Sequence, residues 1–327
     1  MPRVTVYELN FDFHRLSVMF SRVVSCAFRI LRGLLIVTMI SSLQTNHGQT
    51  DNRQTNSLLE CGVAQRIVET KLRDEVIFVS YNIRWRSGKE LEQIINWLKD
   101  RRGSAPMIVG LQEVDRAKTR SDRVNNAKQI ADALGMYYAW TAPAPSGAAT
   151  PKLTEEETGV ELLSPYPLTD VTRIVLPNPG PGGRQRIAIA ATLKLRDTSI
   201  RVYSVHGETR LPIAKKIEQL RAVLTDLDRF PKGMPAVVLG DFNSWELPAV
   251  QGIRELFTAA GFTTPLPDDE STFYRKALMF DVRLKLDWIW LRGFTPQSYG
   301  IDRKLTVSDH FPLWTAATLA KANAASN

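Results

Sequence analysis

Polar side chains that can bind a cation or move a proton stand at the ends of apolar, β-prone runs in this sequence. They are Asn82, Glu113, His206, Asp241, Asn243, Asp309 and His310. Carboxylate and amide oxygens are the usual ligands of hard cations that keep part of their water shell, so these residue types favour Mg²⁺ or Mn²⁺ over zinc. Imidazole and carboxylate groups beside such a cation suit general acid–base chemistry and the stabilisation of charge on oxygen.

Each of these residues, taken alone, also has an ordinary structural interpretation. Asp241 and Asn243 fit a turn that is capped by its own side chain. Glu113 fits a surface carboxylate, and His206 fits a core histidine with satisfied hydrogen bonds. The ends of strands are, however, where open α/β sheets place their ligands. Because the same coincidence recurs at several strand ends, we interpret these residues together as one site.

Cysteine and histidine are scarce in this chain. It has two cysteines, Cys26 and Cys61, and 4 histidines. A structural zinc site of the Cys₄ or Cys₂His₂ type is hard to build from this set, and so is a disulfide framework. We therefore expect any bound metal to be held by oxygen.

The apolar patterning from residue 75 onward predicts strands that alternate with helices. Strands are predicted over 76–81, 107–111, 187–195, 199–205, 236–239, 286–291 and 313–319. Helices are predicted over 91–98, 125–134 and 213–228, with Gly135 ending the second. The turn 196–199 predicts a hairpin, and 141–158 and 177–183 are expected to be loops. Because successive strands are joined in some places by a hairpin and in others across a helix, we predict a mixed sheet, or a pair of sheets, flanked by helices.

Composition and charge limit the classes of function. The chain has 327 residues, of which 44% are hydrophobic and 23% charged, and this excludes collagen-like, low-complexity and wholly disordered proteins. The net charge of +8, from 42 basic and 34 acidic residues, favours an anionic partner such as nucleic acid, another phosphoester or a membrane surface. A charge that serves only solubility is the alternative.

The N-terminal part of the chain differs from the rest. Arginines among apolar residues are followed by the uncharged run 33–43, a pattern that predicts a signal peptide or membrane anchor over 1–43. We therefore expect an exported protein, periplasmic or secreted, with membrane association through 15–43; an amphipathic helix of the folded domain is the alternative. Cleavage after residue 43 would remove five arginines and two acidic residues and leave a net charge of +5. The remaining boundaries are a linker over 44–70, one domain over 71–320 and a tail over 321–327.

A set of motifs connects the candidate residues to a known family. They are Ser80–Arg84, Val109–Asp115, Leu163–Pro167, Tyr203–His206, Val238–Ser244, Leu286–Trp290 and Ser308–Pro312. In this order they make the sequence over 75–320 similar to the endonuclease/exonuclease/phosphatase superfamily, which includes DNase I-like nucleases, sphingomyelinases and inositol-polyphosphate phosphatases. The resemblance implies an α/β (α+β) fold, a four-layer sandwich of two mixed β-sheets packed face to face with helices outside.

The resemblance also implies a metal site. It makes Glu113 the main ligand of Mg²⁺ or Mn²⁺, with Asn82 and Asp309 close to the metal or to its waters. The implied activity is divalent-metal-dependent hydrolysis of a phosphodiester by in-line attack of water. Such an attack accumulates charge on oxygen, which a metal and two imidazoles stabilise.

The remaining candidate residues receive catalytic roles from the same resemblance. Asp241 would orient and deprotonate the attacking water, and Asn243 would hold the phosphate or that water. His310, with its ring fixed by Asp287, would donate a hydrogen bond to a non-bridging phosphate oxygen. His206 would contact the phosphate from the other side.

The sequence departs from the family pattern in two segments. Glu161 replaces a small residue and Pro165 a basic one, so the family's substrate contacts from that segment do not carry over to this sequence. Gly207 stands after His206, where the usual family motif has a leucine after its histidine. The catalytic set itself is complete, so we expect activity.

The substrate is left open by the sequence. Basic residues that would contact a nucleic-acid backbone, or merely solvate a helix start or a hairpin, are Arg116, Lys118, Arg120, Arg123, Arg184 and Arg186. An exported phospholipid or sphingomyelin phosphodiesterase is an alternative, although Trp288, Trp290 and Trp314 lie in strand patterns typical of a core rather than a membrane face. A non-catalytic binding protein on the same fold is disfavoured, because no metal or water residue is lost. We expect a monomer that acts on a phosphoester.

Overall fold

The computed structural model describes residues 58–68, 73–103, 105–144, 157–278 and 280–320. All described residues belong to one compact unit, Gln54–Asn327. The predicted signal or anchor over 1–43 and the predicted tail over 321–327 therefore lie outside the described residues. Within the described ranges, no helix has the length and apolar character needed to span a bilayer.

Two large sheets form the centre of this unit. The first is seven-stranded, in the order β1-β4-β5-β3-β2-β14-β13. Its strands are β1 (Leu59–Val63), β2 (Glu75–Asn82), β3 (Met107–Arg116), β4 (Tyr137–Thr141), β5 (Glu157–Ser164), β13 (Phe294–Ile301) and β14 (Leu313–Leu319). Among these, β2 and β3 are parallel and the other pairs are antiparallel.

The second sheet is five-stranded, in the order β12-β9-β8-β7-β6. Its strands are β6 (Thr169–Val175), β7 (Ile187–Leu195), β8 (Thr198–His206), β9 (Ala236–Asp241) and β12 (Asp287–Arg292). Here β8 and β9 form the parallel pair. Each sheet thus contains one parallel pair, whose carboxyl ends lie at one edge. A separate two-stranded hairpin consists of β10 (Phe273–Ala277) and β11 (Phe280–Leu284).

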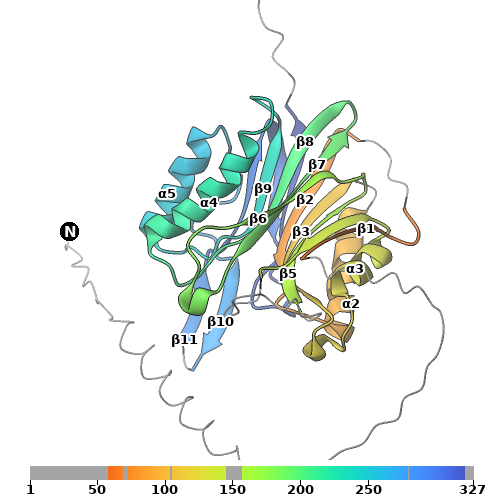
Figure 1. Cartoon of the computed structure of the whole chain (residues 1–327), viewed down its shortest axis with the longest axis horizontal. Helices are drawn as coiled ribbons and strands as arrows, with labels where there is room; N and C mark the ends of the chain where they lie inside the picture. Colours follow the sequence, from red (N-terminus) through yellow and green to blue (C-terminus); the bar gives the residue numbers. More distant parts are fainter. Residues whose placement is uncertain (1–57, 69–72, 104, 145–156, 279, 321–327) are drawn as a thin grey trace, which may run out of the picture. The chain divides into compact units, whose positions relative to one another are not determined.

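Helices cover the outer faces of both sheets (Figure 1). The first sheet packs against α2 (Gly88–Arg102) and α3 (Asn126–Leu134), and the second against α4 (Ile213–Leu227) and α5 (Leu247–Ala259). A third apolar cluster joins the inner faces of the two sheets. The sequence-based prediction of a four-layer α/β sandwich with two mixed sheets is therefore confirmed.

Alternating side chains of one strand show why both sheets are buried on two faces. In β2, Ile77, Val79 and Tyr81 pack in the cluster that includes α2 and α3, whereas Val76 and Phe78 face the second sheet. Because both faces are covered, the strand is a continuous apolar run rather than an alternating one. This run is what made the strand recognisable in the sequence.

Several predicted elements agree with the structure and several were missed. The strands predicted over 187–195 and 313–319 have the observed bounds, and Trp288 and Trp290 are fully buried as expected. The strands β1, β4, β5, β6, β10, β11 and β13 and the helix α5 are not among the elements predicted from the sequence. Because β1 pairs with β4, the first sheet extends into the stretch 44–70, for which a linker was predicted.

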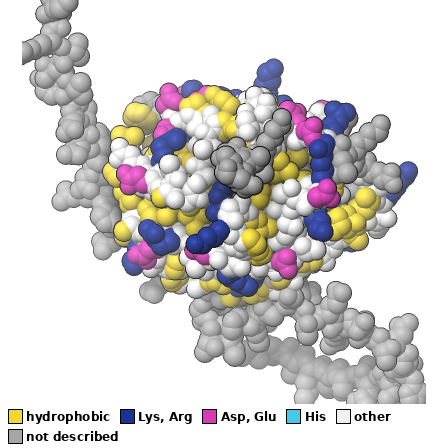
Figure 2. All heavy atoms as spheres, turned by 90° about the horizontal axis from the view of Figure 1, so that it is seen from above, with side chains coloured by type: hydrophobic (Ala, Val, Ile, Leu, Met, Phe, Trp, Pro, Cys, Tyr) yellow, Lys and Arg dark blue, Asp and Glu magenta, His cyan; other side chains and the backbone are white. Residues whose placement is uncertain are grey.

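The surface carries mixed charge on the face shown in Figure 2. Lys and Arg side chains there lie among Asp, Glu and hydrophobic side chains, and no histidine is visible. The positive balance of the chain is therefore not gathered into one basic patch on this face.

Candidate active site

Three of the candidate residues are placed side by side by strand register in the second sheet. His206 ends β8 and pairs with Asp241 at the end of the parallel strand β9. Asp241 also pairs with Asp287, the first residue of the antiparallel strand β12. Residues far apart in the sequence thus form one row at the edge of the sheet.

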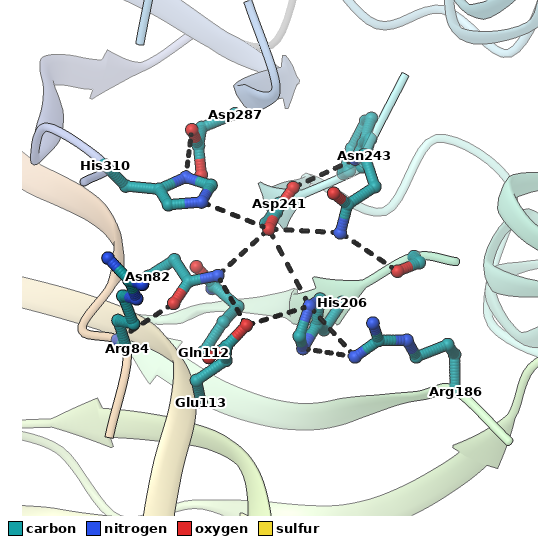
Figure 3. Close-up of polar contacts among 12 residues, drawn as sticks. Asn82, Arg84, Gln112, Glu113, Arg186, His206, Asp241, Asn243, Asp287 and His310 are labelled. Atoms are coloured by element: carbon teal, nitrogen blue, oxygen red, sulfur yellow. Dashed lines mark hydrogen bonds and ion pairs between the residues drawn. The ribbon is translucent and has the colours of Figure 1, made fainter. Parts of the chain in front are cut away.

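The first sheet contributes from the facing edge. Asn82 ends β2 and pairs with Gln112 of β3. The register of β3 against β5 shifts between Gln112 and Val114, and the intervening Glu113 has a positive φ of 57°. A β-bulge of this kind re-aims one side chain, and it points the Glu113 carboxylate toward the second sheet (Figure 3).

Asp241 is the centre of the cluster (Figure 3). Its Oδ2 accepts hydrogen bonds from Asn82 Nδ2 at 3.0 Å and from Asn243 Nδ2 at 3.2 Å. His206 Nε2 and His310 Nε2 lie 3.7 Å and 3.8 Å from the same oxygen. One buried carboxylate oxygen is therefore surrounded by four polar side chains from two sheets.

Burial raises the pKa of Asp241 to about 7, with the nearby Asp287 and Glu113 carboxylates adding to the rise and His310 and Asn82 opposing it. A carboxylate takes up a proton most effectively when its pKa lies near the working pH. Asp241 is thus suited to act as a general base near neutral pH.

The His310 ring is oriented by the buried Asp287 carboxylate, which the Thr272 hydroxyl supports. Its Nδ1 lies 2.8 Å from Asp287 Oδ2, and the same oxygen accepts a hydrogen bond from the Thr272 hydroxyl at 2.7 Å. Burial works against protonation of this ring, but Asp287 and Asp241 outweigh it and raise the pKa of His310 to about 10. The ring is therefore an imidazolium, and its Nε2 lies 3.8 Å from Asp241 Oδ2.

His206 has the opposite electrostatic environment. Burial is the main cause that lowers its pKa well below the ordinary value, and the charge of Arg186 is the next. Arg186 Nη1 lies 3.2 Å from Nδ1 and 3.1 Å from Nε2 of this ring. One histidine of the site is therefore neutral and the other charged.

The donor set fits a hard divalent cation at Glu113. Its carboxylate is 22% exposed, lies 3.8 Å from His206 Nε2 and is adjacent to the Asn82 amide at 3.4 Å. Asp241, Asp287 and His310 also place ligand atoms within 4.8 Å of one another. The hydrogen bond between His310 and Asp287 fits an orienting pair better than two ligands, so Glu113 remains the better candidate. Asn82 faces Glu113 with its amide Nδ2, and its Oδ1 accepts from the Arg84 N–H, so this side chain would have to turn over to serve as a ligand.

Asp309 lies at the rim of the same cleft, but another residue engages it. Its carboxylate forms an ion pair with Arg84 at 2.8 Å. Arg84 belongs to the motif that contains Asn82, and its backbone N–H donates to Asn82 Oδ1 at 3.0 Å. Asp309 is thus near the predicted metal site, with its charge compensated by this arginine.

A cleft of about 320 Å³ connects these groups to solvent. The predicted residues Glu113, His206, Asp241, Asn243, Asp309 and His310 line it. Its other walls include Trp85, Trp245 and Arg275. The cleft therefore gives a substrate access to the oxygen of Asp241 and to both histidines.

Two of the basic residues after Glu113, Arg116 and Arg120, are held by acidic partners. Arg116 pairs with Glu60 at 3.0 Å, and Arg120 binds the fully buried Asp115 through two hydrogen bonds of 2.8 Å. Arg120 also stacks on Trp85, with its guanidinium carbon 4.3 Å from the ring centre. These arginines are built into the fold, beside the cleft.

The departures from the family pattern have physical reasons or consequences. A Cβ at Gly207 would lie 2.7 Å from the Phe242 carbonyl oxygen, so the close approach of the two segments excludes a larger residue. Glu161 is fully buried in β5, and neither of its carboxylate oxygens has a partner among the described residues. Burial, with a contribution from Glu60, raises the pKa of Glu161 well above its ordinary value.

Some residues that shape the site were missed in the sequence. Thr272 lies in a loop and gives no sequence signal, yet it holds Asp287. Glu208 follows His206 by two residues, a signal that was available, and its buried carboxylate binds Arg184 and Arg186. Ser308 was part of a motif, and its hydroxyl anchors the Asn82 carbonyl at 2.8 Å.

A two-sheet sandwich with carboxylates, amides and imidazoles gathered between the sheet edges defines a class of proteins with a hydrolase-type, metal-compatible site. The chain belongs to the Endonuclease/Exonuclease/phosphatase family, whose model matches residues 79–310. This confirms the family resemblance seen in the motifs. A search among curated proteins finds no match.

Solved structures show the same fold. An endonuclease/exonuclease/phosphatase from Beutenbergia cavernae aligns with a TM-score of 0.59 and 16% identity over 76% of this chain and 72% of that one. The human Nocturnin catalytic domain aligns with a TM-score of 0.54 and 16% identity, over 76% of this chain and 96% of that one. The mannosyl-6-phosphatase Bt3783 of Bacteroides thetaiotaomicron aligns with a TM-score of 0.54 and 16% identity, over 75% of this chain and 100% of that one. At these identities the likeness shows the fold alone.

Proposed function

We propose that this protein is a phosphodiesterase that uses Mg²⁺ or Mn²⁺ and hydrolyses its substrate by in-line attack of water. The observation that carries the proposal is the environment of Asp241 Oδ2, which two amides contact directly and two imidazoles approach within 3.8 Å. Solved structures on the same fold include a mannosyl-6-phosphatase and a 2',3'-cyclic phosphatase. Phosphoester hydrolysis is therefore the chemistry that family and geometry support best.

The proposed roles follow from charge and position. Asp241 accepts a proton from the attacking water, and Asn243 restrains Asp241 through its backbone N–H at 2.9 Å and its side chain. The charged His310 donates to an oxygen of the phosphoryl group, where negative charge grows in the transition state. The neutral His206, backed by Arg186, faces the same group from the opposite wall.

Glu113 and Asn82 would hold the divalent cation. When bound, the cation polarises the phosphoryl group and offsets its charge. The bulge at Glu113 directs the carboxylate into the cleft, whereas the buried Asp287 is withdrawn behind His310. We thus assign metal binding to Glu113 and Asn82 and proton transfer to Asp241.

A substrate screen tests the proposal directly. Purified full-length protein with Mg²⁺ is incubated with plasmid DNA, RNA, sphingomyelin, inositol phosphates and bis(4-nitrophenyl) phosphate. We expect hydrolysis of at least the generic diester and faster hydrolysis of one natural class. Absence of turnover on every substrate, with a correctly folded protein, would overturn the proposal.

A lipid phosphodiesterase is the second candidate, and one observation favours it. The β10–β11 hairpin carries Leu278 and Phe280 at its end, with exposed fractions of 90% and 70%. The base of the hairpin lines the cleft through Phe273 and Arg275. Two exposed apolar side chains together at the end of a hairpin form a small apolar surface that suits contact with a lipid interface. Substitution of Leu278 and Phe280 by serine would lower activity on sphingomyelin vesicles and spare activity on soluble diesters if this candidate is right.

We also propose export, with residues 1–43 acting as a signal or an anchor and 15–43 providing any membrane association. The basis is the order of basic and apolar residues in the sequence. Fractionation of a bacterium that expresses the native chain would place the protein outside the cytoplasm or in the membrane. Recovery of the intact chain from the soluble cytoplasm would overturn this proposal and leave the catalytic one untouched.

A further inference from the structure

A second, smaller cavity opens beside the cleft, and the roles given above do not use it. It encloses about 240 Å³ and shares Glu113, Arg186 and His206 with the cleft. Arg120 and Arg184 form its other charged walls. We call the space between these three arginines the arginine pocket.

Two of the arginines are fixed by a single buried carboxylate. Glu208 is fully buried and binds Arg184 through Nε at 3.0 Å and Nη2 at 2.6 Å, and Arg186 through Nε at 3.1 Å. The backbone N–H of Arg210 donates to the same carboxylate, and the backbone N–H of Glu208 donates to the Gln219 side chain. The carboxylate is therefore rigid, and it holds both guanidinium groups in one orientation.

The third arginine is fixed in the same way from the other sheet. Arg120 binds both oxygens of the buried Asp115 and stacks on Trp85. Its side chain is 43% exposed, and that of Arg184 is 40% exposed. Arg120 and Arg184 thus each bind a buried carboxylate while part of the side chain stays exposed beside the pocket.

Each of the three guanidinium groups has a nitrogen that donates to no acceptor among the described residues. Within the described ranges, Arg120 Nη1, Arg184 Nη1 and Arg186 Nη2 form no hydrogen bond. A guanidinium that is already ordered loses little further entropy when it binds an anion, and its planar fork matches phosphate and carboxylate oxygens. The arrangement is what a preorganised anion site requires.

We propose that the arginine pocket binds a second anionic group of the substrate, a phosphate or a carboxylate adjacent to the phosphate that is cleaved. This inference rests on the proposed function, because Glu113 and His206 form the wall that the pocket shares with the cleft. The substrate is then a phosphodiester with a neighbouring anion, either along a nucleotide backbone or on a phosphorylated polyol. Arg184 is a specificity-determining residue, and Glu208 is its positioning residue.

Calorimetric binding in EDTA tests the inference without turnover. In the nucleotide arm, thymidine 3′,5′-bisphosphate is compared with thymidine 5′-monophosphate; in the polyol arm, inositol 1,4-bisphosphate is compared with inositol 1-phosphate. We expect the wild-type protein to bind one bisphosphate about tenfold more tightly than its monophosphate, since a charge-assisted contact of this kind contributes at least one factor of ten. The arm that shows the preference identifies the source of the second anion.

Arg184→Gln should reduce that preference to about twofold or less, and Arg184→Lys should leave an intermediate value. Glu208 keeps Arg186 as a partner in both variants, so their melting temperatures should stay close to wild type. The matched control is Arg254→Gln, because Arg254 is 42% exposed and binds both oxygens of Asp268 through Nε and Nη2 but lies on α5, outside the pocket. Equal affinity for mono- and bisphosphates in both arms, or an unchanged preference in Arg184→Gln, would overturn the inference. Since the assay needs no hydrolysis, its outcome is independent of the substrate screen.

Discussion

The two ends of the sandwich carry polar residues of similar kinds in opposite environments. At the site end, Asp241, Asp287 and His310 are all buried and share a small volume. At the other end, near the β7–β8 turn, Arg196 forms an ion pair with Asp74, and their side chains are 53% and 74% exposed. Water can solvate the second pair, whereas the first group must compensate its charges internally.

This difference shows that the charged groups that are costly to bury lie at the site end of the fold. Clustered buried carboxylates raise one another's pKa, and they persist only where neighbours fix them. Exposed pairs contribute little to stability and carry no such constraint. We therefore expect substitutions at the site end to change activity more than folding, and substitutions at the opposite end to change little of either.

Removal of the metal should have the largest effect. EDTA should abolish hydrolysis, and Mg²⁺ or Mn²⁺ should restore it, if oxygen ligands hold a hard cation as proposed. Glu113→Gln removes the principal charge at constant shape, so activity titrated against Mg²⁺ should require a higher concentration. Full activity in EDTA would contradict the mechanism.

Loss of the base or of the charged imidazole comes next. Asp241→Asn and His310→Ala should each lower kcat about 10²-fold or more, an order of magnitude typical of general-base and oxyanion-donor losses. The melting temperature of Asp241→Asn should equal or exceed that of wild type, because one of the crowded carboxylates is gone. Thermal unfolding beside initial rates checks both; loss of folding together with activity would indicate a structural role instead.

An intermediate effect is expected behind His310. Asp287→Ala leaves the ring in place but removes the oxygen that holds Nδ1, so kcat should fall about 10- to 100-fold, the range typical of orienting partners. Thr272→Val removes only the hydroxyl that supports Asp287 and should cost less. Wild-type rates in the alanine variant would show that the pair does not orient the ring.

Glu161 allows the effect of burial to be measured without chemistry. Its pKa is raised in the folded state, so at a pH above its ordinary value the folded protein retains a proton that the unfolded chain releases, and stability falls as pH rises. Glu161→Gln should remove this dependence, and its stability advantage should grow between pH 5 and pH 8 by up to about 1.4 kcal/mol per pH unit. Urea denaturation at several pH values measures it; parallel curves for both proteins would refute the interpretation.

The smallest effect is expected at the opposite end. Arg196→Ala breaks the exposed pair with Asp74, which should change the free energy of unfolding by less than about 1 kcal/mol. Hydrolysis should be unchanged, since this residue is remote from the cleft. A loss of activity in this variant would erase the contrast between the two ends.

The sequence by itself determined the fold class, the family and the identity of the candidate residues. Continuous apolar runs such as 187–195 and 313–319 predict buried strands because both faces of each sheet are covered. Motifs directly after such runs, such as Gly240–Asn243, identify the strand ends where polar groups gather. The polar edge strands β1 and β6 escaped this reasoning, since a strand with partly exposed faces shows no continuous apolar run.

Only the tertiary structure decided how these residues divide their work. Register placed Asp241 between His206 and Asp287, and the bulge at Glu113 turned its carboxylate into the cleft. The opposite charge states of the two histidines follow from neighbours brought in by other elements, Arg186 for His206 and Asp287 for His310. A pKa depends on burial and on charges a few ångströms away in space, and residue spacing along the chain does not record these.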